Sequence, residues 1–116
     1  MPIESPKLTI DVAHPPRRAE VVEDELQQAA SQARNSPGIR VLKIIHGHGS
    51  SGKGGATRET VRNWLYLNRR MFRDVIDGEN YDPGNMPTAT LRKEVGTYAD
   101  SDLNACNEGV TIVWIK

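Results

Sequence analysis

Cysteine, long apolar runs and net charge are all scarce in this sequence. Cys106 is the only cysteine among 116 residues, which excludes a disulfide framework and a thiolate metal cluster. No apolar run approaches the roughly 20 residues of a membrane-spanning helix, so we expect no membrane partner. The N-terminal sequence, MPIESPKLTI, lacks the basic and apolar regions of a signal peptide. A single cytoplasmic domain is therefore expected.

The absence of net charge conceals an uneven distribution of charge along the chain. Fifteen Lys and Arg residues balance fifteen Asp and Glu residues. Eight of the cations lie between Arg40 and Arg73, where Glu59 is the only anion, so seven cations and fourteen anions remain elsewhere. This asymmetry predicts one basic face and an acidic remainder.

Apolar spacing and turn residues predict the order βαβαββ. A helix starting at Thr57 is expected to reach Leu67 and to continue through Ile76, ending at Asp77-Gly78. The other expected elements are a strand over Lys7–Ala13, a helix from Pro15-Pro16 to Ala33, a strand over Ile39–Ile45, a loop over Asn80–Thr90, and strands over Leu91–Ala99 and Val110–Ile115. This order predicts a two-layer α/β domain with a mixed four-stranded sheet and helices packed on it. Residues 1–6 are expected to be a disordered lead to one domain over residues 7–116.

A glycine-rich loop, His46–Gly55, follows the second predicted strand and precedes a helix. A loop of this kind at a helix N-terminus is typical of phosphate binding, because it exposes backbone N–H groups and the positive end of the helix dipole. The side chains that add chemistry to the loop are His46, His48, Lys53 and Arg58. A loop that uses glycine only for turns is the alternative.

The loop resembles a nucleotide-binding P-loop only in part. Gly47–Lys53 satisfies the first seven positions of that motif, but Gly54 stands where a Ser or Thr hydroxyl would hold magnesium. We therefore do not expect an NTPase.

The same region resembles the Smr (small MutS-related) domain family. The matching motifs are the HGxG sequence His46-Gly47-His48-Gly49, the helix residues Arg58, Val61, Trp64 and Leu65, and the final strand Gly109–Val113. Three departures are visible. Thr57 stands where the family usually has a Leu before the helix arginine. The family's Asp-x-His motif has Ala13 at its histidine position, with His14 one residue later. Residues from about Leu67 to Leu91 exceed the family's usual helix-to-strand link, which suggests an insertion that could dock a protein partner or pad the sheet edge.

The resemblance implies binding of DNA or RNA and endonuclease activity, with a role in DNA repair or RNA processing. It would place the backbone N–H groups of Gly47 and Gly49 on a phosphate, with Arg58 opposing its charge. His46 is a candidate acid or base, and Asp11 could orient His14 or bind a metal at the end of the neighbouring strand. A structural role for His46 and a solvated charge at Asp11 are the alternatives.

A metal site and a phosphate track are further hypotheses. His14, His46, His48 and Asp11 could supply metal ligands, but chance explains such a pattern, so no metal site is predicted and Mg²⁺ is only an optional cofactor. On a continuous helix, the phosphate-binding candidates Arg58, Arg62, Arg69 and Arg73 would share one face. A solvated helix face is the alternative.

Three other functions stay open from the sequence. The domain could bind nucleic acid without cleaving it, because the displaced His14 would then mark a lost active site. It could act as a protein–protein adaptor through residues 67–91. It could instead bind a small phosphate compound with the glycine loop alone.

Overall fold

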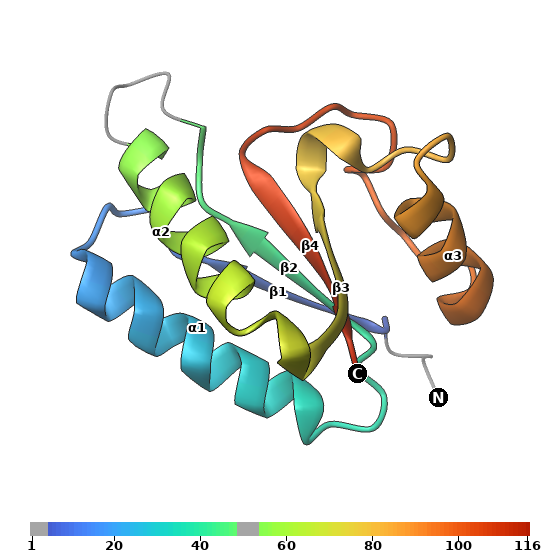
Figure 1. The fold of residues 1–116 in the computed structure, drawn as a ribbon, viewed down its shortest axis with the longest axis horizontal. Helices are drawn as coiled ribbons and strands as arrows, with labels where there is room; N and C mark the ends of the chain where they lie inside the picture. The colour runs from blue at the N-terminus through green and yellow to red at the C-terminus, as the bar shows by residue number, and fades with distance from the viewer. Residues whose placement is uncertain (1–4, 49–53) are drawn as a thin grey trace.

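A computed structural model of the chain describes residues 5–48 and 54–116 (Figure 1). The predicted disordered lead falls mainly on residues 1–4, which lie outside the described residues. The elements are β1 (Lys7–Asp11), α1 (Ala19–Arg34), β2 (Val41–Ile45), α2 (Gly54–Leu67), β3 (Phe72–Asp77), α3 (Met86–Val95) and β4 (Val110–Ile115). Short 3₁₀ turns, η1 (Arg69–Met71) and η2 (Gly78–Asn80), flank β3.

The four strands form one mixed sheet in the order β1-β2-β4-β3. β1 and β2 are parallel, whereas β4 is antiparallel to both of its neighbours, β2 and β3. β4 is therefore an inner strand, and all six of its residues are buried. The predicted mixed four-stranded sheet is confirmed.

Helices cover both faces of this sheet, so the domain has three layers and not the two expected (Figure 1). On one face α1 and α2 contribute Val22, Leu26, Val61 and Leu65 to a core that also includes Val113 of β4. On the other face α3 contributes to a smaller core, whose buried members are Val41, Ile76, Tyr81, Leu91, Ile112 and Trp114. Alternate residues of β4 face the two cores, as the pleat of a strand requires. No helix in the described part of the chain is long and apolar enough to cross a membrane.

The predicted continuation of the second helix through Ile76 is wrong. The helix ends at Leu67, and the chain turns through η1 into β3. The pairing of β3 with β4 shifts between Phe72 and Asp74, as in a β-bulge. The extra residue lets Phe72 and Val75 pack on the same core although they lie three apart. That spacing is typical of a helix, which explains why apolar periodicity misassigns this strand.

The predicted loop over Asn80–Thr90 and strand over Leu91–Ala99 are also wrong, because α3 occupies Met86–Val95. Asn85 caps this helix by accepting a hydrogen bond from the Thr88 amide at 3.2 Å. Gly96 follows its last residue with φ of 93°. The observed order is therefore βαβαβαβ.

Residues 67–91, interpreted above as an insertion, contribute to the framework of the domain. They contain the whole of β3 and the first part of α3. Phe72, Ile76 and Leu91 are buried in the two cores. Their burial leaves fewer apolar groups of this segment free for a protein partner.

Candidate functional site

The candidate site lies at the carboxyl ends of β1 and β2. Asp11 pairs with Ile45 in the parallel register, and the Val12 amide donates to the Ile45 carbonyl at 3.0 Å. The sequence around Asp11 and His14 therefore leaves the sheet beside the loop that begins at His46. Ligands of open α/β sheets collect at this edge.

Asp11 holds His14 in a defined orientation. Its Oδ2 and Oδ1 atoms lie 2.9 and 3.1 Å from Nδ1 of His14, and Oδ1 also accepts from the amides of Ala13 and His14. Burial would raise the pKa of Asp11, but the amide and imidazole hydrogen bonds outweigh it and lower the pKa. The His14 side chain is 70% exposed, so Asp11 orients the ring while the ring stays open to solvent.

The one-residue displacement of the histidine does not prevent this contact. Ala13, at the family's usual histidine position, is buried and turned into the core. Arg17, which sequence analysis did not single out, donates to the carbonyls of Asp11 and Pro15 at 3.3 and 3.1 Å. It also pairs with Glu25 of α1 at 3.0 Å. These bonds fix the segment that carries His14 to the start of α1.

His46 is completely buried, and both of its ring nitrogens have partners. Nδ1 donates to the Gly47 carbonyl at 2.6 Å, because a carbonyl can only accept. Nε2 then accepts from the Thr111 hydroxyl at 2.8 Å, whose oxygen accepts from Nε of Arg62 at 3.3 Å. Burial lowers the pKa of His46 to about 4, so the ring is neutral at pH 7. This arrangement favours the structural alternative for His46.

The backbone after His46 is bonded within the protein. The amides of His46 and Gly47 both donate to the Gly109 carbonyl, at 2.9 and 3.0 Å. The Gly47 N–H, expected to face a phosphate, therefore has an internal acceptor in this structure. Gly47 has φ of 74°, which favours glycine. His48 is exposed, whereas the candidates Gly49 and Lys53 lie outside the described residues.

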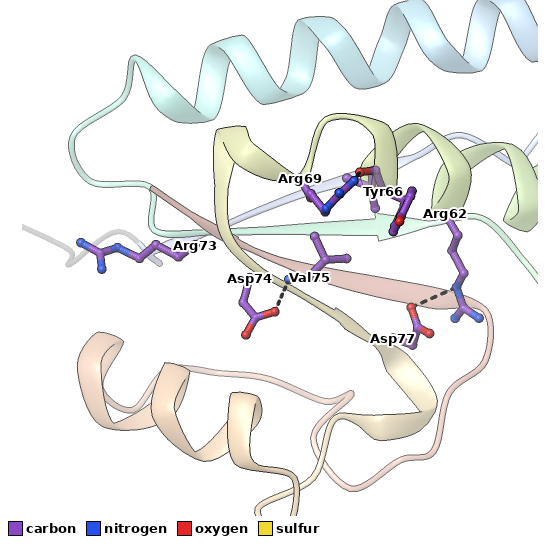
Figure 2. A pocket seen from close by; sticks show the side chains of 8 residues that line it. Arg62, Tyr66, Arg69, Arg73, Asp74, Val75 and Asp77 are labelled. Atoms are coloured by element: carbon purple, nitrogen blue, oxygen red, sulfur yellow. Dashed lines mark hydrogen bonds and ion pairs between the residues drawn. The ribbon is translucent and has the colours of Figure 1, made fainter.

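The four candidate arginines do not share one helix face, because α2 ends at Leu67. Arg69 lies in η1 and Arg73 in β3 (Figure 2). Arg58 pairs loosely with Glu108 at 3.6 Å. Arg62 makes a bidentate pair with Glu79 at 2.7 and 3.0 Å and approaches Asp77 at 3.3 Å.

The ion pair with Arg62 also changes the pKa of the Glu79 carboxylate. Burial would raise the pKa of Glu79, but the hydrogen bond from Arg62 outweighs it and lowers the pKa. Arg62, Glu79 and Thr111 form a hydrogen-bonded network that ends at the His46 ring. Sequence analysis missed Thr111 and Glu79 as supports, although the matching final strand Gly109–Val113 already contained Thr111.

Within residues 5–48 and 54–116, no three His, Cys, Asp or Glu side chains come together as metal ligands. The three histidines and Asp11 do not meet at one point there. The buried His46 ring is occupied by Gly47 and Thr111, while His14 is held by Asp11.

The family model of the Smr domain matches residues 14–85, more than half of the chain. The chain belongs to the Smr domain family. The matched segment includes the HGxG sequence and the Arg58–Leu65 stretch of α2. Smr domains are generally nucleic-acid-binding and are known for nicking.

A solved structure supports the fold of this Smr domain. The fold of this chain is similar to the crystal structure of the Smr domain of MutS2 from Thermus thermophilus, with a TM-score of 0.55 and 20% sequence identity. The similarity covers 95% of this chain and 96% of that one. No curated protein matches the chain.

Proposed function

We propose that this Smr domain binds DNA or RNA at the carboxyl ends of β1 and β2 and cleaves a phosphodiester there. The observation that carries the proposal is the Asp11–His14 pair. Its carboxylate lies 2.9 Å from Nδ1 of a mostly exposed imidazole. An oriented histidine beside a phosphate-binding element is the arrangement that general acid–base catalysis needs.

His14 has the chemistry for proton transfer in this proposal. With Nδ1–H donating to Asp11, Nε2 carries the free lone pair and can take a proton from the attacking hydroxyl or water. Asp11 then stabilises the imidazolium that forms. The proton returns to the leaving oxygen as its bond to phosphorus breaks.

Charge on the phosphate would be opposed by the start of α2. This helix begins at Gly54 without an acidic residue in its first turn, and its N-terminus provides unsatisfied amides and a positive dipole end. Arg58 lies one turn further and is 30% exposed. Because its contact with Glu108 is 3.6 Å long, its guanidinium can turn to a phosphate at small cost. Gly49 and Lys53 complete this anion site in the proposal.

Cleavage of labelled single-stranded, duplex and branched DNA and RNA tests the catalytic part. His14→Ala is expected to lower the cleavage rate about 10²- to 10⁴-fold while changing Kd less than twofold. Lys93→Gln, which removes an exposed charge on α3 and lies outside the proposed site, is the control and should retain activity. Cleavage that persists in His14→Ala would refute the role of His14. Parallel reactions with Mg²⁺ and with EDTA test the proposed optional Mg²⁺.

Binding without cleavage is the second candidate, and the internal hydrogen bond of the Gly47 amide favours it. It removes one of the donors that would stabilise a phosphorane-like transition state. Salt-dependent binding by the wild type, with no cleavage of any substrate, would select this alternative.

A further inference from the structure

We infer that the opposite end of the sheet is a second contact surface for the phosphate backbone of the bound nucleic acid. This inference rests on the proposed function. The surface, called the cationic end below, consists of Arg34, Arg40, Arg69, Arg70, Arg73 and Lys116. All six lie at the amino ends of β1 and β2, away from Asp11 and His14.

Strand register explains why residues so far apart in sequence meet there. Val41, the first residue of β2, pairs with Trp114 near the end of β4, and Phe72 at the start of β3 pairs with Ile115. α1 ends at Arg34 just before this edge, and α2 leads through η1 into β3. Figure 1 shows these helix ends and the C-terminus gathered at one end of the sheet.

The surface of the cationic end is hollowed, and the hollows join. One cavity of about 220 Å³ is lined by Arg34, Arg40, Arg73 and Lys116, and no carboxylate lines it. A neighbouring cavity of about 310 Å³ shares Arg34 and Lys116 with it and also lacks a carboxylate. Arg69 and Arg73 also line a groove of about 490 Å³ between α2 and β3, and the carboxylates of Asp74 and Asp77 line that groove as well (Figure 2).

The charges of this surface are not neutralised by the protein. Among the described residues, none of the six cations has a carboxylate within ion-pair distance, whereas most of the chain's other described cations do. Neutral groups hold several of them instead. The Arg69 guanidinium lies 4.2 Å from the Tyr66 ring and donates to the Tyr66 carbonyl at 2.7 Å. Arg73 lies 5.5 Å from the Trp114 ring.

Helix dipoles are too weak to explain this concentration of charge. The C-termini of α1 and α2 both reach the cationic end, and each carries a partial charge of roughly −0.5. Two helix ends therefore offset about one of the six positive charges. Asp74, which pairs with Trp114 at this end of the sheet, offsets about one more. The remaining charge is complementary to an anionic partner with several charged groups, such as a phosphate backbone.

The distance between the two ends suits a continuous nucleic acid. The five residues of β2 separate them, which corresponds to about 17 Å at a rise of about 3.3 Å per residue. Successive base pairs rise about 3.4 Å. A duplex contacting both ends would therefore extend about five base pairs beyond the reacting phosphodiester.

Salt-dependent binding of a labelled 20-base-pair duplex tests the inference. The variant carries Arg34→Gln, Arg40→Gln, Arg73→Gln and Lys116→Gln together. Each phosphate contact that it loses should reduce the slope of log K against log salt by about 0.9. We expect a loss of two or more such contacts and at least tenfold weaker binding at low salt. Lys93→Gln, an exposed cation on α3, is the control and should bind like the wild type.

Crosslinking shows directly which residues lie against the duplex, even if the quadruple variant folds poorly. In a Cys106→Ser background, a photoreactive group at Arg70→Cys should crosslink to the duplex, and one at Lys93→Cys should not. If the wild type binds the duplex, but the quadruple variant keeps the same salt slope and position 70 does not crosslink, this inference is wrong while the proposed function stands. An acidic protein would then be the partner of this surface. No binding by the wild type at low salt to this duplex or to single-stranded or branched DNA or RNA would refute the proposed function and this inference with it.

Discussion

The two ends of the sheet use arginine in opposite ways. At the carboxyl ends of β1 and β2, Arg17 and Arg62 pair with Glu25 and Glu79, and Arg58 reaches Glu108. At the cationic end, guanidinium groups rest on aromatic rings and carbonyl oxygens instead. Paired arginines hold the candidate site in shape, whereas unpaired ones stay available to a ligand. The end of the sheet with the candidate chemistry is therefore distinct from the end where unpaired cations gather.

The largest expected difference between the two ends concerns glycine. A Cβ at Gly78, under the candidate site, would collide with the Asn107 carbonyl and lie 2.6 Å from Val110 Cγ2. Gly78→Ala should therefore lower the free energy of unfolding by about 3 kcal/mol or more. Gly38→Ala, in the loop at the cationic end, meets nothing within 4 Å and should be neutral or stabilising by up to about 1 kcal/mol. Urea denaturation measures both, and equal effects would contradict this view of a tightly packed site end.

The next effect is the pH dependence of stability, which comes from His46 at the site end. The pKa of His46 falls from its ordinary 6.5 to about 4 on folding, so between these values the unfolded chain binds a proton that the folded chain does not. Stability should be full above pH 6.5 and should fall by about 3 kcal/mol as the pH approaches 4. Asp11 and Glu79 have lowered pKa values in the folded protein. The stability that they contribute is therefore lost at lower pH, as the pH falls below their ordinary pKa values of 3.8 and 4.5.

Urea denaturation of the wild type and of His46→Asn from pH 7.5 to 4.5 checks this expectation. The variant should lose most of the slope between pH 6.5 and 5. NMR titration of the His46 ring in the wild type provides an independent measurement. A ring that titrates near pH 6.5 in the folded protein would contradict the complete burial of His46.

The smallest effect compares one arginine from each end. Arg62→Gln leaves Glu79 and Asp77 without their guanidinium and should cost about 2 kcal/mol of stability. Arg73→Gln removes only an exposed contact with the Trp114 ring and should cost less than about 0.5 kcal/mol. Thermal denaturation at two salt concentrations measures the difference. A larger loss for Arg73→Gln would mean that the cationic end serves stability and not binding.

Several parts of the site could be predicted from sequence because their signals are local. The strand before His46 and the helix carrying Arg58 follow from periodicity and turn chemistry over about twenty residues. The position of Asp11 and His14 beside the loop that begins at His46 follows from the parallel pairing of two consecutive strands. The predicted strand at Val110–Ile115 is confirmed for the same reason, since its apolar run is nearly continuous.

The errors lie where a nonlocal feature alters a local pattern. The bulge in β3 gives a strand the spacing of a helix, and only pairing with β4 distinguishes the two. The missed α3 has clear caps at Asn85 and Gly96, but the prolines and glycine around it resemble a loop. Its apolar face is short because it covers only the smaller of the two cores.

The sequence by itself determined the family, the mixed sheet and the edge at which Asp11, His14 and His46 leave their strands. Only the tertiary structure decided which charges are available. Of the basic segment Arg40–Arg73, Lys43 and Arg62 are paired with acidic residues distant in sequence and Arg58 contacts Glu108 only loosely, while Arg34 and Lys116 join the others at the cationic end. Ion pairing depends on which side chains the sheet register brings within 4 Å, and composition along the chain carries no information about that distance.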